Sequence, residues 1–282
     1  MSPRRNIGSL IRVSVPGFNG PVHVRQDGPA DAQALVLLHG FGGSMQWYDL
    51  VVPHLEDGFR LIRVDLLGHG STGGPAADAP LQARVVDAVL AELGVTGATA
   101  VGHSFGADVA VELAENSERV ERLIVVTQAP DYSDATLPRG RVLMTLPVLG
   151  AVLGRTFQAL AFVVEAVAAR RRGPRSGAEL AAQELQDFRA LRLRMFRIVL
   201  VDRRDRMARR PLDTQIRDAG KPTLVILGGL DHFYGARSAA RYRAAGAEVQ
   251  VLDDSGHSPL VEVPGEAAVL IRRFVTEALT GA

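Results

Sequence analysis

The sequence predicts an α/β domain in which a mostly parallel sheet is flanked by helices and interrupted by a helical insert. Three observations lead to this fold class. Apolar runs of strand length alternate with segments whose apolar residues recur at helical spacing, an order typical of parallel sheets covered by helices on both faces. The alternation stops between residues 131 and 210, where no run resembles a strand, and it resumes at residue 222. We therefore expect residues 1–130 and 211–282 to form the core domain and residues 131–210 to form a helical cap.

The composition is that of a globular protein with a large core. The chain has 282 residues, of which 47% are hydrophobic and 22% are charged, so it is not a disordered chain. It contains no cysteine, which excludes disulfides, thiolate metal sites and cysteine nucleophiles. The N-terminal stretch MSPRRNIGSLIRVSV lacks the apolar centre of a signal peptide, and we expect a cytoplasmic protein.

The first half of the core domain is expected to open with an antiparallel pair of strands, because LIRVSV and VHVRQ are joined by a turn rich in proline, glycine and asparagine. The run LVLLHGFGG that follows is apolar and ends in glycines, as is typical of a central parallel strand buried on both faces. The next expected elements are a helix near 45–56, a strand at 60–66 and a helix over 80–93.

The second half continues the alternation on both sides of the insert. Before the insert we expect a strand at 98–103, a helix over 105–116 and a strand at 120–128. After it we expect a strand at 222–229, a helix near 235–245, a strand at 247–252 and a final helix over 264–279.

The motif GHSFG, at residues 102–106, places Ser104 between the strand at 98–103 and the helix at 105–116. In a strand-to-helix turn of the GxSxG type, the serine is strained and its hydroxyl projects above the sheet, where it can act as a nucleophile. The alternative is a serine in an ordinary glycine-rich turn. The strand and the helix on either side favour the nucleophile.

A serine nucleophile needs a base, and His257 is the strongest candidate among the seven histidines. It follows the last predicted strand and therefore belongs at the same carboxyl edge of the sheet as Ser104, where open parallel sheets bind their ligands. His39 and His69 lie in glycine-rich turns and are consistent with structural roles. His103 is expected to point away from the site if the pleat of its strand continues.

The imidazole in turn needs a carboxylate that holds it in one tautomer. Asp231 follows the strand before His257, again at a carboxyl edge, and gives the chain order Ser, Asp, His. Asp131, in the loop after the preceding strand, is the second candidate. Asp253 and Asp254 are expected to be surface residues of a turn.

The tetrahedral intermediate needs hydrogen-bond donors for its oxyanion, and two backbone amides are the usual source. We expect one from Phe105, which follows the serine, and the other from Phe41 in the loop HGFGG. The glycines of that loop, Gly40, Gly42 and Gly43, allow a close approach of the backbone.

With HGFGG, DLLGHGST, GHSFG, GGLDHF and SGHSPLVEVP in this order, the sequence resembles the α/β-hydrolase superfamily, in its cap-bearing branch of esterases, lactonases, carbon–carbon bond hydrolases and cofactor-free haloperoxidase-like enzymes. The resemblance covers residues 10–130 and 218–280 and implies the α/β-hydrolase fold, with Ser104 as nucleophile, Asp231 as acid and His257 as base. It implies no cofactor and no metal ion. Related epoxide hydrolases and haloalkane dehalogenases carry aspartate in place of the serine.

Two departures from the family pattern occur near these motifs. Ala107 stands where the family often has glycine, a change that adds only a methyl group. After Asp231 the chain reads HFYG in place of a proline-containing turn.

The insert combines a long apolar stretch with a strongly basic one. Residues 142–169 are long and apolar enough to suggest a membrane span, but Arg155, Glu165, Pro147 and two glycines interrupt them. We therefore expect cap helices that close an apolar pocket and no span, with contact at a membrane surface as the alternative. Residues 139–217 hold 17 arginines against seven acidic residues, whereas the whole chain has a net charge of only +1.

The arginines of the insert allow two interpretations. Nine of them lie in residues 188–210. In the first interpretation they form a solvated helical face. In the second they form a site that binds an anionic substrate or an acidic acyl-carrier protein. Arg192, Arg194 and Arg197 are the candidates for the second interpretation. We expect no nucleic-acid partner, because these arginines lie beside a hydrolase site and without a recognised binding fold.

These observations predict a serine hydrolase that cleaves an ester, thioester or lactone of a small acyl substrate through an acyl-enzyme. Three alternatives use the same residues or the same fold. They are an acyltransferase or cyclase of a biosynthetic pathway, a carbon–carbon bond hydrolase, and a binding scaffold without activity.

Overall fold

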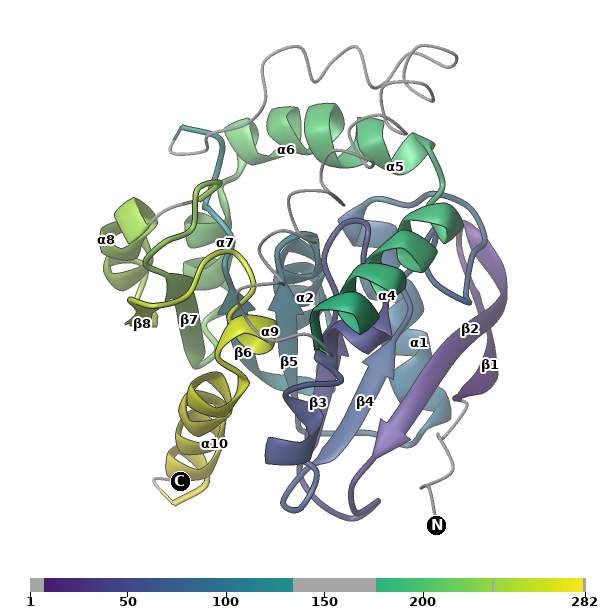
Figure 1. Ribbon diagram of the computed structural model, residues 1–282, viewed down its shortest axis with the longest axis horizontal. Helices are drawn as coiled ribbons and strands as arrows, with labels where there is room; N and C mark the ends of the chain where they lie inside the picture. Colours follow the sequence, from purple (N-terminus) through teal and green to yellow (C-terminus); the bar gives the residue numbers. More distant parts are fainter. Residues whose placement is uncertain (1–7, 134–175, 235, 281–282) are drawn as a thin grey trace.

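The computed structural model describes residues 8–133, 176–234 and 236–280, and its centre is one eight-stranded sheet with helices on both faces (Figure 1). The strand order is β1-β2-β4-β3-β5-β6-β7-β8. β2 pairs with β1 and β4 in antiparallel fashion, and all other neighbours are parallel. The strands are β1 (Ser9–Val15), β2 (Phe18–Asp27), β3 (Ala34–Leu38), β4 (Arg60–Val64), β5 (Ala98–His103), β6 (Val120–Val126), β7 (Thr223–Gly228) and β8 (Glu248–Leu252). This topology confirms the predicted fold class.

The central strands are buried on both faces. Every residue of β3, β5 and β7 is buried, which explains why these segments read as continuous apolar runs without alternation. β1, at the edge, alternates exposed and less exposed residues, as expected of a strand with one wet face.

Helices cover the two faces of the sheet and enclose two hydrophobic clusters. One cluster lies under α1 (Ala79–Glu92), α2 (Phe105–Asn116), α7 (Leu212–Ala219) and α8 (Ala239–Ala244). The other lies under α10 (Pro264–Thr280), the short α9 (Pro259–Glu262) and the 3-10 turns η1 (Met45–Tyr48) and η2 (Val52–His54). In Figure 1, α1 and α2 lie behind the sheet and α10 in front of it. The sheet is thus the middle of three layers.

The described part of the insert is helical and extends over the carboxyl ends of the parallel strands. It comprises α4 (Ser176–Ala190), α5 (Arg194–Arg197), a π-helical turn η4 (Ile198–Asp202) and α6 (Arg203–Arg209). In Figure 1, α5 and α6 lie above the edge toward which the arrow of β5 points. Met195, Phe196 and Met207 are buried in the larger hydrophobic cluster, so these helices pack against the core domain.

Most predicted elements are confirmed, and two differ for local reasons. The single helix expected near 45–56 is replaced by η1 and η2, because Pro53 lacks the amide that a continuous α-helix needs at that position. α7 was not predicted, because Leu212 and Ile216 are its only buried apolar residues and give too short a periodic signal. The 142–169 stretch lies outside the described residues. No helix within the described residues has the length and hydropathy that a membrane crossing requires.

Candidate active site

Ser104 lies between the last residue of β5 and the first residue of α2, as the motif predicted. Its backbone has φ 50° and ψ −120°, an unusual conformation for a residue with a side chain. Its amide donates a hydrogen bond to the carbonyl of Val126 on the next strand, at 3.0 Å. Ser104 is partly exposed, in contrast to the buried residues on either side. This is the strand–turn–helix geometry that displays a serine hydroxyl above a sheet.

The two glycines of the motif are required by close backbone contacts. A Cβ atom on Gly102 would lie 2.2 Å from the carbonyl oxygen of Gly106. A Cβ atom on Gly106 would lie 2.0 Å from the carbonyl oxygen of Leu38, at the end of β3. Glycine at these positions lets α2 pack directly against the ends of β5 and β3. Ala107, the departure from the family pattern, is fully buried, as is Phe105 at the start of the helix.

His257 and Asp231 form the predicted pair. His257 Nδ1 and Asp231 Oδ2 are 2.9 Å apart, and the carboxylate is almost completely buried, with 2% of its side chain exposed. The other oxygen, Oδ1, accepts hydrogen bonds from the amides of Phe233 and Tyr234, at 2.7 and 3.2 Å. Residues 231–234 therefore form a turn closed by the aspartate itself. Because Oδ2 accepts from Nδ1–H, Nε2 of the imidazole is left as the basic nitrogen.

The environment of Asp231 keeps it ionised. Burial by itself raises the pKa of this carboxyl. The hydrogen bond and charge of His257, together with the two amide donors, outweigh burial and hold the pKa below its ordinary value. A carboxylate in this state can stabilise an imidazolium when His257 accepts a proton.

His103 does not point away from the site, and this expectation was wrong. Its Nε2 donates to the backbone carbonyl of His257 at 2.7 Å, and the rings of the two histidines are 5.1 Å apart. The ring of His103 also stacks on Trp47, at 5.8 Å between centroids. The alternation of faces stops at His103, because β5 ends there and the chain turns into the elbow.

The glycine loop that was expected to supply an oxyanion donor lies beside Ser104. A Cβ atom on Gly40 would lie 3.2 Å from the Cβ of Ser104, so the backbone that leads into Phe41 is close to the serine. His39 Nδ1 and the amide of Gly43 both bond to the carbonyl of Gly40, at 2.8 and 3.2 Å, and fix its orientation. His39 is buried, in agreement with a structural role.

Phe41 and Phe105 have different surroundings. The ring of Phe41 packs edge-on against Phe196 of α5 at 5.0 Å and against His69 at 6.4 Å. Phe105 is the first residue of α2 and is 1% exposed, so its amide lies at the N-terminus of a helix, where backbone donors are available.

Asp65 was not singled out from the sequence, yet it holds the two glycine loops of the site together. Its carboxylate is bonded by His23 Nδ1 at 2.9 Å and by the amides of Met45 and Ser71, each at 2.8 Å. A Cβ atom on Gly70 would lie 2.4 Å from its carboxyl carbon, which explains the glycine at that position. Its position directly after a buried strand was the only feature of the sequence that could have indicated this role.

The other candidate acids are not bonded to His257 within the described residues, where Asp231 makes that bond. Asp131 pairs with Arg241 at 2.8 Å and accepts hydrogen bonds from Ser133. Asp253 and Asp254 are exposed, as predicted.

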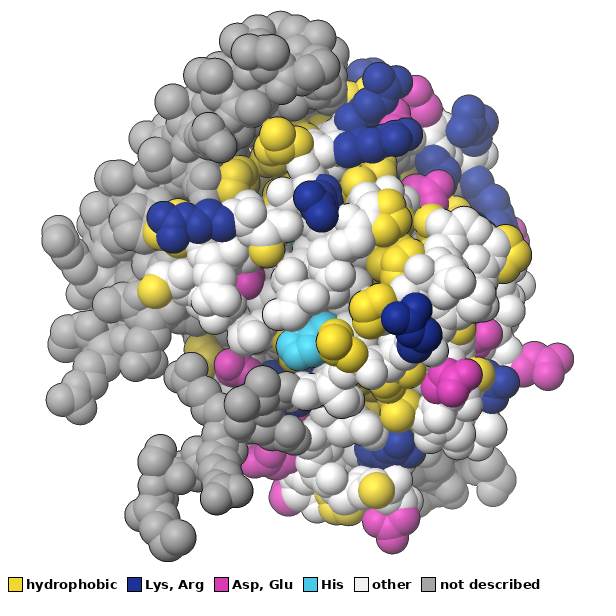
Figure 2. Space-filling model, turned by 90° about the vertical axis from the view of Figure 1, so that its right-hand side faces the viewer, with side chains coloured by type: hydrophobic (Ala, Val, Ile, Leu, Met, Phe, Trp, Pro, Cys, Tyr) yellow, Lys and Arg dark blue, Asp and Glu magenta, His cyan; other side chains and the backbone are white. Residues whose placement is uncertain are grey.

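Only three of the nine arginines in residues 188–210 are held in ion pairs with α2. Arg203 and Arg206 contact Asp108, and Arg210 contacts Glu115. The exposed remainder, which we call the arginine surface, consists of Arg189, Arg192, Arg194, Arg197, Arg204 and Arg209. Figure 2 shows basic side chains gathered along the upper part of the molecule, the level at which Figure 1 places α5 and α6.

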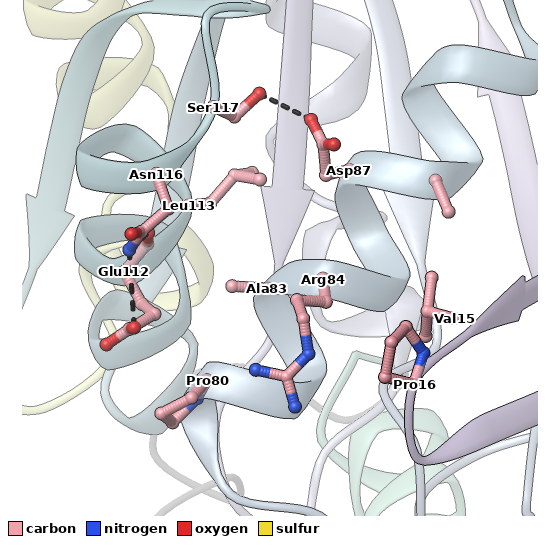
Figure 3. A pocket seen from close by; sticks show the side chains of 11 residues that line it. Val15, Pro16, Pro80, Ala83, Arg84, Asp87, Glu112, Leu113, Asn116 and Ser117 are labelled. Carbon is pink, nitrogen blue, oxygen red and sulfur yellow. Dashed lines mark hydrogen bonds between the residues drawn. The ribbon is translucent and has the colours of Figure 1, made fainter.

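A separate pocket of about 390 Å³ opens between α1 and α2 (Figure 3). Arg84, Asp87, Glu112 and Asn116 are among its polar lining residues. Asn116 is the last residue of α2, whereas Ser104 precedes its first residue. At 1.5 Å per residue this separates them by about 18 Å. This end of the pocket is therefore remote from Ser104. Within the described ranges, no group of three or more His, Asp or Glu side chains is arranged to hold a metal ion.

The fold and the elbow define a protein of the α/β-hydrolase class. A model of the alpha/beta hydrolase family matches residues 35–269, and the chain belongs to this family of enzymes. A pimeloyl-[acyl-carrier protein] methyl ester esterase of Aromatoleum aromaticum is 31% identical over 257 residues, which cover 86% of this chain and 97% of that protein.

Solved structures show the same fold. A hydrolase from Pseudomonas aeruginosa superposes with a TM-score of 0.77 at 24% identity, covering 96% of this chain and 99% of that one. The esterase RhEst1 from a Rhodococcus species superposes with a TM-score of 0.72 at 25% identity, covering 95% of this chain and 98% of that one.

Proposed function

We propose that the protein is a serine hydrolase that cleaves a carboxylic ester, thioester or lactone through an acyl-enzyme. The observation that carries the proposal is the Asp231–His257 hydrogen bond of 2.9 Å, in a loop whose backbone is bonded to His103, the neighbour of the strained Ser104. Family membership supports the hydrolytic chemistry.

In this mechanism the hydroxyl of Ser104 attacks the acyl carbon while Nε2 of His257 takes its proton. Asp231 stabilises the imidazolium. The amides of Phe41 and Phe105 stabilise the negative oxygen of the tetrahedral intermediate. The imidazolium then gives the proton to the leaving group, and a water molecule, deprotonated by His257, releases the acid and restores Ser104.

Residues 131–210 act in this proposal as a cap that covers an apolar acyl pocket. The contact between Phe41 and Phe196 supports it, because it joins the expected oxyanion loop to a helix of the insert. A lipophilic acyl group would lie beside this contact.

Replacement of the nucleophile tests the proposal. Ser104→Ala should lower kcat for a nitrophenyl acylate by at least about 10⁴-fold, because removal of a triad member leaves only the contributions of binding and the oxyanion hole. It should also abolish labelling by a fluorophosphonate. Asp131→Asn serves as the matched control, since Asp131 is paired with Arg241 and not with His257. Full turnover by the Ser104 variant would require a different nucleophile.

A carrier-bound ester is the more specific substrate class that the arginine surface favours. The similar esterase of Aromatoleum aromaticum acts, by its name, on a methyl ester attached to an acyl-carrier protein. The exposed cations on the insert would attract an acidic carrier or an anionic acyl group.

A further inference from the structure

The backbone carbonyl of His257 is bonded by two buried side chains from two different strands. His103 Nε2, at the end of β5, and Thr127 Oγ1, directly after β6, both lie 2.7 Å from this oxygen. His103 is 3% exposed and Thr127 is fully buried. Both side chains must donate these hydrogen bonds, because a carbonyl oxygen can only accept.

Thr127 holds its position at a conformational cost. Its φ of 44° is in the left-handed region, which a β-branched residue rarely adopts. Its amide donates to the carbonyl of Ile226 at 2.8 Å, which fixes the backbone in this conformation. Strain of this kind persists only where the surrounding structure requires it. In this strained conformation the hydroxyl of Thr127 donates its hydrogen bond to the carbonyl of His257.

His103 is suited to be a permanent donor. The bond to the carbonyl requires the proton on Nε2. Burial, followed by the nearby charge of His257, lowers the pKa of His103 to about 3, so its ring stays neutral when His257 becomes protonated. Stacking against Trp47 fixes the plane of the ring. Because His103 is also the residue before Ser104, it links the serine turn directly to the histidine loop.

We propose that Thr127 and His103 are positioning residues that together anchor the loop of His257 and set the direction of its imidazole toward Ser104. This rests on the proposed function, in which His257 is the base. Asp231 fixes the ring from the Nδ1 side, and the two donors fix the backbone that carries it. The imidazole is thus held from both ends.

Paired variants of Thr127 separate the hydroxyl from the shape of the side chain. Thr127→Val keeps the branched shape and removes the donor, whereas Thr127→Ser keeps the donor. With a nitrophenyl acylate we expect Thr127→Val to lower kcat about tenfold and to change KM less than about twofold, since one buried acceptor loses a partner. Thr127→Ser should retain kcat close to that of the wild type.

The matched control is Thr99→Val. Thr99 is a fully buried residue of β5 whose hydroxyl has no hydrogen-bond partner among the described residues. This variant makes the same chemical change without removing a bond, and kcat should stay at the wild-type level. Equal kcat in Thr127→Val and Thr99→Val would overturn the proposal for Thr127.

His103 provides an independent pair of variants if Thr127→Val does not fold. His103→Gln carries an amide nitrogen near the position of Nε2, and His103→Asn is too short to place one there. We expect kcat to fall in His103→Asn and to be largely restored in His103→Gln. The same loss in both would show that the bond to the carbonyl is not what matters.

A spectroscopic measurement distinguishes failure of this proposal from failure of the proposed function. The Nδ1 proton of His257, bonded to Asp231, can be followed by NMR in histidine-labelled protein without any substrate. Its signal should be sharp in the wild type and Thr127→Ser, and broadened or lost in Thr127→Val. If Ser104→Ala remains active, the proposed mechanism fails. The Nδ1 signal still shows whether Thr127 anchors the loop of His257, because it needs no substrate. An unchanged signal in Thr127→Val overturns the anchoring.

Discussion

At the scale of single residues, the site depends on backbone positions that only particular side chains tolerate. Ser104 and Thr127 are the two non-glycine residues with positive φ in the described parts of the chain. Both lie at the carboxyl ends of neighbouring strands, and one carries the expected nucleophile while the other contacts the expected base. Glycines 102 and 106 allow this arrangement because a Cβ atom at either position would overlap backbone atoms.

Asp187 of α4 gives a residue-scale prediction about pH. Burial, with a smaller contribution from the charges of Asp65 and Asp49, raises its pKa to about 6, although the polar groups of Ser44 and Gln183 act in the opposite direction. A carboxyl with a raised pKa binds its proton more tightly in the folded state. Its stabilising effect is therefore complete below about pH 4 and is lost as the pH rises through about 6.

Asp187→Asn mimics the protonated form. We therefore expect the difference in free energy of unfolding between this variant and the wild type to shift in favour of the variant by about 2 kcal/mol between pH 4 and pH 8. Urea unfolding at several pH values measures this difference. The exposed Asp202→Asn provides a control at the surface, where a single ion pair contributes little to stability. A constant difference between the wild type and Asp187→Asn across this range would contradict the prediction.

At the scale of elements, one buried ion pair connects α2, the helix that follows Ser104, to α6 of the insert. Arg203 Nε and Nη2 contact the two oxygens of Asp108 at 2.5 and 3.0 Å, and both side chains are almost fully buried. Gln128 adds a bond to Asp108 at 3.1 Å, and the guanidinium of Arg203 lies over the ring of Tyr132. The π-helical turn η4 ends directly before Arg203.

Removing one partner of this pair leaves the other buried without its counter-charge. Asp108→Ala should therefore lower the free energy of unfolding by about 3–5 kcal/mol. The double variant Asp108→Leu/Arg203→Met should recover much of this loss, since apolar side chains of similar volume carry no desolvation cost.

The control for this prediction is the exposed pair of Arg197 and Asp202, 3.3 Å apart. Arg197→Ala should change the stability by less than about 1 kcal/mol. Urea unfolding of the four proteins gives the comparison. Similar small losses for Asp108→Ala and Arg197→Ala would mean that the ion pair does not hold α6 to the core.

At the scale of the whole molecule, charge is distributed unevenly although the net charge is only +1. The arginine surface lies on the helices above the carboxyl edge of the sheet, and the structure changes which of its members are good candidates for binding. Arg192 donates to the carbonyl of Gly74, and Arg197 pairs with Asp202. Arg194, Arg204 and Arg209 are exposed and form no ion pair with the described residues.

Charge reversal at Arg194, Arg204 and Arg209 should raise KM for an acyl group on an acidic carrier protein about tenfold or more at low salt, and the effect should shrink as salt rises. A neutral nitrophenyl ester should keep its KM. Arg217→Glu, on α7 in the core domain, is an exposed control outside the insert. Equal changes in KM for both substrates would argue against an anionic partner.

The sequence by itself determined the order of the strands and of most helices along the chain, the turn at Ser104 and the pairing of His257 with Asp231. These features are local: they depend on apolar periodicity, on glycines at the ends of strands and on polar residues that follow them. The prediction of one helix near residue 50 was wrong because Pro53 interrupts it, and this signal too is local.

Only the tertiary structure decided the contacts made between distant segments. Thr127 and His103 meet the carbonyl of His257 across 130 and 154 positions of the chain. Asp65 joins two loops, and Asp108 finds Arg203 from another helix. No periodicity encodes such partners, because a hydrogen bond or an ion pair depends on how separate elements pack. The same packing separates the arginines that are buried and paired from those that remain available on the surface.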